Sequence, residues 1–176
     1  FIQNGLGLEI FMDKIFTIYP NLKVLDASIN IKNVIKEDEV NPHVWTSIEN
    51  YINQVKEISQ VLIQQNSENK QIYEENTEKY MKDLEKVEKQ YEEISQELIG
   101  QKAICLNEAL EYLAKDIKLE YISLHTDHDE NSMSAESIKN IINKMNTENI
   151  KIILIGKDDS IKNAEILANE TNAKIY

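Results

Sequence analysis

The sequence contains no arginine, a single cysteine, two prolines and only four glycines among 176 residues. All 19 basic residues are therefore lysines, and 31 acidic residues bring the net charge to −12. A chain of this charge repels nucleic acid and anionic membranes, and it is compatible with binding cations. One cysteine excludes an internal disulfide bond, so the thiol content says little about the cellular compartment.

Long apolar runs are also missing. No segment approaches the roughly 20 apolar residues that a membrane-spanning helix needs, and no signal peptide is visible. The chain is long enough to bury a core and to form one domain or two small lobes. Phe1 begins within an apolar pattern, so we expect the chain to be part of a longer protein.

Glycine and proline are absent between Pro42 and Gly100, and residues 67–98 of this stretch predict one long helix. Its larger side chains follow an alternating spacing of four and three, which is typical of one narrow stripe on a helix. They are Tyr73, Tyr80, Leu84, Val87, Tyr91, Ile94 and Leu98, with Thr77 in the remaining position. A coiled-coil arm is the alternative, but three stripe positions are tyrosines and only about four heptads are present. We expect a mostly solvated helix that contacts two lobes.

The segment before this helix predicts half of an α/β unit. Gly5 and Gly7 predict a sharp turn, and apolar residues at helical spacing follow as far as Phe16. Residues 22–25 (LKVL) predict a short buried strand. A Gly-x-Gly turn without a third glycine or a following lysine is weak evidence for a phosphate-binding loop.

His43 lies in the sequence Asn-Pro-His-Val-Trp, directly before an amphipathic helix. Thr46 or Ser47 is the expected N-cap residue of that helix. A single histidine on a loop is usually a surface residue. Here Pro42 and the bulky Trp45 restrict the loop, and metal sites require ligands that are held in place. His43 is therefore a candidate metal ligand.

Strand and helix patterns alternate after residue 100, which predicts a parallel sheet covered by helices. The expected strands are residues 103–106, 120–124, 151–155 and 173–176. In open sheets of this kind, ligands bind at the carboxyl ends of the strands. Asn107, Asp158 and residues 125–130 fall at these ends. The last of these runs contains His125 and His128, and it is the densest group of metal-capable side chains in the sequence.

The order of these motifs resembles the zinc/manganese solute-binding proteins of bacterial ABC transporters, which are often lipoproteins and are sometimes called adhesins. The resemblance rests on NGLGLE, on NPHVW, on the long charged helix, and then on AICLNEALEYLAKDIKLE and SAESIKNIINKMNTENIKIILI. It implies two Rossmann-like α/β lobes with parallel sheets, joined by one long backbone helix. The implied boundaries are an incomplete N-terminal lobe in residues 1–66, the linking helix in 67–99 and a C-terminal lobe in 100–176.

The resemblance also implies metal ligands. Four side chains of that family bind one divalent cation in a cleft between the lobes, and one of them falls on His43. Another opens the pattern H-[DE]-A-x-x-Y, which here begins with Asn107, and a third is expected at His125 or His128. The remaining ligands are expected outside these 176 residues. An amide oxygen at Asn107 is a weak donor that suits zinc poorly.

The resemblance implies extracytoplasmic binding of Zn²⁺ or Mn²⁺, in the periplasm or on a cell-surface lipoprotein, and delivery to an ABC transporter permease. We expect a monomer that is not an enzyme. The alternative is a degenerate family member that binds no metal and acts as an interaction or adhesin-like protein. A doubly wound enzyme would need a nucleophile with a base or a phosphate loop. The sequence has no Gly-x-Ser-x-Gly motif, and Cys105 falls in an expected core strand.

Overall fold

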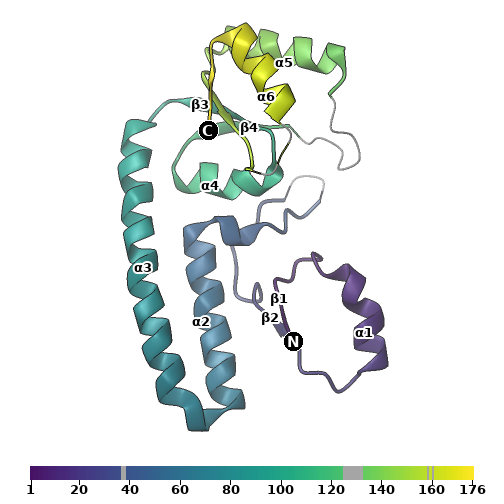
Figure 1. Ribbon diagram of the computed structural model, residues 1–176, viewed down its shortest axis with the longest axis vertical. Coiled ribbons are helices and arrows are strands. Elements are labelled where there is room, and N and C mark those ends of the chain that lie inside the picture. Colours follow the sequence, from purple (N-terminus) through teal and green to yellow (C-terminus); the bar gives the residue numbers. More distant parts are fainter. Residues whose placement is uncertain (37–38, 125–132, 158, 160) are drawn as a thin grey trace. The chain divides into compact units, whose positions relative to one another are not determined.

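The structure is a computed structural model that describes all residues except 37–38, 125–132, 158 and 160. The chain divides into two compact units, Phe1–Gln90 and Tyr91–Tyr176, and the long helix α3 (Lys70–Glu97) runs across their boundary (Figure 1). Parallel sheets combined with one long helix confirm the predicted fold class. None of the helices in the described part of the chain is long and apolar enough to cross a membrane.

The first unit begins with a small β-α-β segment. Strands β1 (Ile2–Gln3) and β2 (Leu25–Asp26) pair in parallel, and the short helices η1 (Ile10–Met12) and α1 (Asp13–Ile18) lie between them in the sequence. The strand expected at residues 22–25 is wrong for its first three residues, because the two-residue β1 pairs only with Leu25 and Asp26. Leu22 and Val24 are accordingly exposed.

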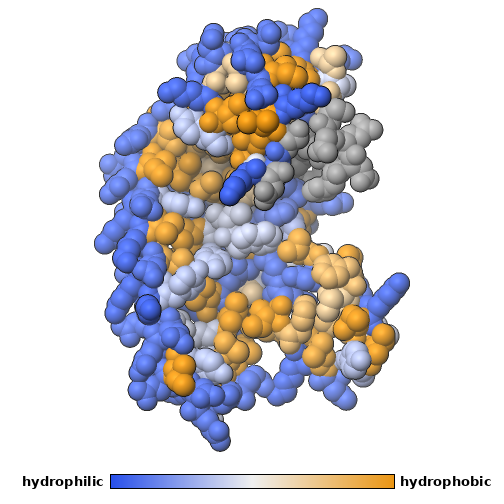
Figure 2. Space-filling model, viewed as in Figure 1, coloured by the Kyte–Doolittle hydropathy of each residue, from blue (hydrophilic) through white to orange (hydrophobic). Residues whose placement is uncertain are grey.

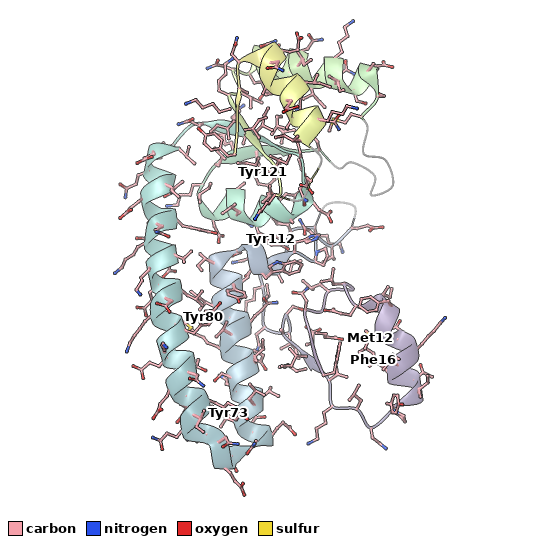
Figure 3. The ribbon with its side chains drawn as sticks, viewed as in Figure 1. Met12, Phe16, Tyr73, Tyr80, Tyr112 and Tyr121 are labelled. Carbon is pink, nitrogen blue, oxygen red and sulfur yellow. The ribbon has the colours of Figure 1, made fainter. Side chains whose placement is uncertain are left out.

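Many apolar side chains around this strand pair are exposed, and Figure 2 shows apolar surface over α1. Met12 and Phe16 lie on the side of α1 that faces the strands (Figure 3), and the Phe16 ring packs against Phe1 with 5.6 Å between centroids. Phe11, in the preceding turn η1, is 73% exposed. The periodicity of this segment therefore predicts a helix correctly, but two short strands cover only one side of it.

A helical hairpin completes the first unit. Helix α2 (Ile48–Gln65) and the first part of α3 lie side by side, and the single turn η3 (Ser67–Asn69) connects them (Figure 1). The hydroxyl oxygens of Tyr51 and Tyr80 are 2.9 Å apart, and the Thr77 hydroxyl donates to Ser59 Oγ at 2.8 Å. These polar contacts hold the stripe of α3 against α2 of the same chain.

Helix α3 is continuous from Lys70 to Glu97, as predicted, and Gly100 takes a φ of 74° in the turn that follows. Leu84 is buried within the first unit, whereas Tyr91 packs against the core of the second unit. Ile94 is 42% exposed, as Tyr80 is, so these two stripe positions are only partly covered. The contacts of Thr77 and Tyr80 with α2 favour a packed helix over a free coiled-coil arm.

The second unit contains a four-stranded parallel sheet in the order β4-β3-β5-β6. The strands are β3 (Lys102–Cys105), β4 (Glu120–Ser123), β5 (Ile152–Leu154) and β6 (Lys174–Ile175). The connecting helices are η4 (Glu108–Leu110), α4 (Glu111–Asp116), α5 (Ala135–Thr147) and α6 (Ile161–Thr171). This alternation is the predicted one, with strand ends shifted by at most one residue.

Side chains of β3 and β5 alternate between the two faces of this sheet. Ala103 and Cys105 pack on the side of α4 and the C-terminal end of α3, whereas Ile104 and Ile153 pack on the side of α5 and α6. Ile104, Ile153 and Leu154 are buried as expected. Ile122 is only half-buried, because β4 is an edge strand of the sheet.

Replacing Ile153 by aspartate is expected to prevent folding of the second unit. Ile153 is 0% exposed, and an unpaired carboxylate there would cost more than about 4 kcal/mol. Thermal unfolding followed by circular dichroism measures the effect. Ile161→Asp is the matched control, because Ile161 is 53% exposed at the start of α6 and should tolerate the same change. Equal melting temperatures for the two variants would show that the core assignment is wrong.

Candidate metal-binding residues

The strand order of the second unit creates a reversal between β3 and β5. From β3 the chain passes through α4 on one face of the sheet to β4, and from β5 it passes through α6 on the other face to β6. The loops that follow these neighbouring strands therefore diverge at their carboxyl ends. This is the place where open α/β sheets bind ligands. Asn107 follows β3 there, and Gly156 and Asp159 follow β5.

Asn107 is held by three hydrogen bonds. Its Oδ1 accepts from the backbone N–H of Ala109 at 2.8 Å, which makes Asn107 the N-cap of the η4–α4 segment. Its Nδ2 donates to both carboxylate oxygens of Asp159, at 3.0 and 2.8 Å. The cap uses one of the two lone pairs of the amide oxygen, so its capacity to bind a cation is reduced.

Asp159 connects the two loops. Besides accepting from Asn107, its Oδ2 accepts from the backbone N–H of Gly156 at 2.8 Å. A Cβ at Gly156 would lie 2.6 Å from the same oxygen, so a larger residue there would displace the Asp159 carboxylate. The sequence pattern pointed to neighbouring Asp158 and not to Asp159. No local pattern distinguishes these two adjacent aspartates, since only the tertiary contact with Asn107 does so.

His125, His128 and Asp158 lie outside the residues that the structure describes, so their roles stay predictions. Within the described ranges, no three or more His, Cys, Asp or Glu side chains are grouped so that they would hold a metal ion. The second unit therefore offers Asn107 and Asp159 at the described part of this edge. Both are oxygen ligands by chemistry, and they are bonded to each other.

His43 is the candidate ligand of the first unit, and its ring is oriented by Asn41. Asn41 Oδ1 accepts from the backbone N–H of His43 at 3.0 Å, and the same oxygen lies 3.0 Å from His43 Nδ1. Because a carbonyl oxygen only accepts, this contact requires the ring proton on Nδ1, and a neutral ring of that tautomer has its lone pair on Nε2. A neutral imidazole with one fixed tautomer is a typical metal ligand. The Trp45 ring packs beside it, with 5.1 Å between centroids.

The loop of His43 is continuous with helix α2. His43 precedes the single turn η2 (Val44–Thr46), in which Val44 is fully buried. Ser47 then caps α2 by accepting from the N–H of Asn50, which confirms one of the two expected caps. The role of Asn41 was missed by the sequence analysis, although an asparagine two residues before a histidine is a signal for this kind of local hydrogen bond.

Cys105 does not have the environment of a nucleophile. The thiol is fully buried in β3, and burial, with a smaller effect from the Glu111 carboxylate, raises its pKa to about 12. Reactive cysteines have lowered pKa values and partial exposure. Its position in the core agrees with the sequence prediction.

Replacing Asn107 by aspartate is expected to destabilise the second unit. The variant loses both N–H donors and places a second carboxylate about 3 Å from Asp159, a loss of about 1–3 kcal/mol at neutral pH. Denaturant unfolding at pH 7 and at pH 4 measures it, because protonation at the lower pH relieves the repulsion. Asn107→Ala is the control that removes the bonds without adding charge. An Asn107→Asp variant as stable as the parent at both pH values would contradict this geometry.

Comparison with known proteins agrees with the motif order. Residues 1–176 match the family of the zinc-uptake complex component A, periplasmic (ZnuA). The chain is 29% identical over 135 residues to the high-affinity zinc uptake system protein ZnuA of Bacillus subtilis (strain 168). This alignment covers 77% of the chain and 42% of that protein, so the chain spans less than half of the length of this relative.

Solved structures show the same fold. A crystal structure of ZnuA superposes with a TM-score of 0.84 at 25% identity, covering 99% of this chain and 68% of that one. The metal-dependent lipoprotein YcdH from Bacillus subtilis gives 0.83 at 25%, covering 100% and 66%. The Mn-bound periplasmic metal binding protein from Candidatus Liberibacter asiaticus gives 0.79 at 28%, covering 99% and 66%. The chain belongs to the family of the periplasmic zinc-uptake component ZnuA.

Proposed function

We propose that this chain is part of an extracytoplasmic protein that binds Zn²⁺ or Mn²⁺ and delivers the ion to the permease of an ABC transporter. The observation that carries the proposal is the orientation of His43. Its Nδ1 lies 3.0 Å from Asn41 Oδ1, and in a neutral ring with the proton on Nδ1, Nε2 is the atom that can bind a metal. A relative named as a zinc uptake protein and a structure named as Mn-bound support the class of ion.

Each unit contributes its own candidate ligands. In the first unit this is His43, and in the second they are Asn107, His125 and His128. Imidazole favours zinc, whereas amide and carboxylate oxygens favour harder ions such as Mn²⁺. With Asn107 at one ligand position, the balance between these two ions shifts toward Mn²⁺.

A binding protein explains this chain better than an enzyme does. The buried Cys105 thiol is not a nucleophile, and the family description names an uptake component. The net charge of −12 favours the approach of cations. Thr77 and Tyr80 of the α3 stripe contact α2 of the same chain, so we propose a monomer rather than a coiled-coil dimer.

Metal titration of the 176-residue chain tests the proposal. His43→Ala is expected to lower the affinity for Zn²⁺ at least about tenfold, because an imidazole ligand is lost. Asn107→His is expected to raise the affinity for Zn²⁺ relative to Mn²⁺, because imidazole replaces an oxygen donor. Isothermal titration calorimetry with each ion measures both effects.

Gln71→Ala on the exposed surface of α3 is the control, and it should titrate like the parent chain. Tight one-to-one binding of Zn²⁺ that His43→Ala leaves unchanged would show that His43 is not a ligand. An unchanged preference between the two ions in Asn107→His would remove Asn107 from the site.

A further inference from the structure

The side chain of Asn4 connects the glycine turn near the start of the chain to the loop that carries His43. Its Nδ2 donates to the carbonyl oxygen of Pro42 at 2.9 Å and to that of Gly5 at 3.1 Å. Its Oδ1 accepts from Nε2 of Gln54 at 2.9 Å. The Asn4 amide thus links three segments of the first unit: the glycine turn, helix α2 and the loop of His43. Its contact in that loop is with Pro42, the residue directly before His43.

The turn that carries Asn4 is itself fixed. The Glu9 carboxylate accepts from the backbone N–H of Asn4 at 2.7 Å and from that of Gly5 at 3.1 Å. Gly5, Leu6 and Gly7 take φ values of 89°, 56° and 86°, a run of positive values that is unfavourable for the leucine. A Cβ at Gly5 would lie 2.1 Å from Asp26 Oδ1, so no other residue fits there.

The partners of Asn4 on α2 and on the loop are equally constrained. Gln54 is 5% exposed in the middle of α2. The Pro42 carbonyl that accepts from Asn4 also accepts from the N–H of Val44 at 2.8 Å. Asn4 therefore holds the peptide on one side of His43, while Asn41 holds the ring.

We propose that Asn4 is a positioning residue for metal binding at His43: it fixes the His43 loop from outside the ligand shell. This inference rests on the proposed function and adds to it a role for the NGLGLE motif, which the ligand assignment leaves unexplained. Asn4 needs an amide for this role, because the position requires two donors and one acceptor. Residues that orient a ligand typically change metal affinity by about ten- to a hundredfold.

Asn4→Asp separates positioning from simple electrostatics. Aspartate has the same shape and keeps an acceptor for Gln54, but it loses both donors to Pro42 and Gly5. An added negative charge by itself would strengthen the binding of a cation, whereas loss of positioning weakens it. The two explanations thus predict opposite signs. We expect Asn4→Asp and Asn4→Ala both to lower the affinity of the chain for Zn²⁺ about tenfold.

A second readout needs no metal. Long-range ¹H–¹⁵N NMR correlations report which ring nitrogen of His43 is protonated, and the His43→Ala spectrum assigns the signals. In the metal-free parent chain we expect Nδ1–H, as the contact with Asn41 requires. In both Asn4 variants we expect a mixture of tautomers, because the peptide of Pro42, which joins Asn41 to His43, is no longer held by Asn4.

Two controls match the variants. Ser59→Ala removes the hydrogen bond to Thr77 and so weakens the same unit without touching the loop. Asn33→Asp adds the same charge at an exposed position of that unit. Both should keep the affinity and the tautomer of the parent chain.

Three results would overturn the inference. Asn4 variants within about twofold of the parent affinity, or an unchanged tautomer, would remove Asn4 from this role. If Ser59→Ala lost the same affinity, the loss in the Asn4 variants would come from a less stable first unit and not from the position of His43. If His43→Ala leaves the affinity unchanged, the proposed function fails, and the inference fails with it. If His43→Ala lowers the affinity but the Asn4 variants do not, only the inference fails.

Discussion

The pairing of β3 with β4 on one edge and with β5 on the other is the interaction on which the second unit depends. It buries Ile104 and Ile153 on one face and Cys105 on the other, so α4 must cover one side while α5 and α6 cover the other. Because the chain leaves β3 and β5 toward opposite faces, their loops separate at the carboxyl ends. The candidate ligand position at Asn107 is therefore a consequence of the strand order.

At that edge, the side chain of Asn107 has two structural roles. As an N-cap, Asn107 satisfies the free N–H groups at the start of the η4–α4 segment, and as a donor it connects this loop to Asp159. A histidine in the same place could bind a metal, but it could not donate twice to a carboxylate. Asn107 thus forms a link between the two loops that a histidine at this position could not form. Any metal bound here would rely more on oxygen ligands.

Periodicity in the sequence predicts the helices and the second sheet because these elements depend on local spacing and on burial. The alternation after residue 100 yields β3 to β6, and the stripe on α3 yields one continuous helix. The same reasoning fails for residues 22–24, because whether a short apolar run forms a strand depends on its partner. Here the partner strand β1 has only two residues, so it pairs only with Leu25 and Asp26. Apolar spacing likewise predicts the helical segment η1–α1 without predicting that Phe11 is exposed.

In the candidate site, too, the hydrogen bonds between residues close in the sequence could be predicted, and those between distant residues could not. The cap at Ser47, the cap at Asn107 and the orientation of His43 all act within three residues, so sequence motifs signal them. The bonds from Asn107 to Asp159 span 52 residues and the bond from Asn4 to Pro42 spans 38. Nothing near Asn4 in the sequence points to Pro42. The folding of β1, β2 and α2 brings Asn4 and Pro42 together. The position of the His43 ring therefore depends on packing that exists only in the folded unit.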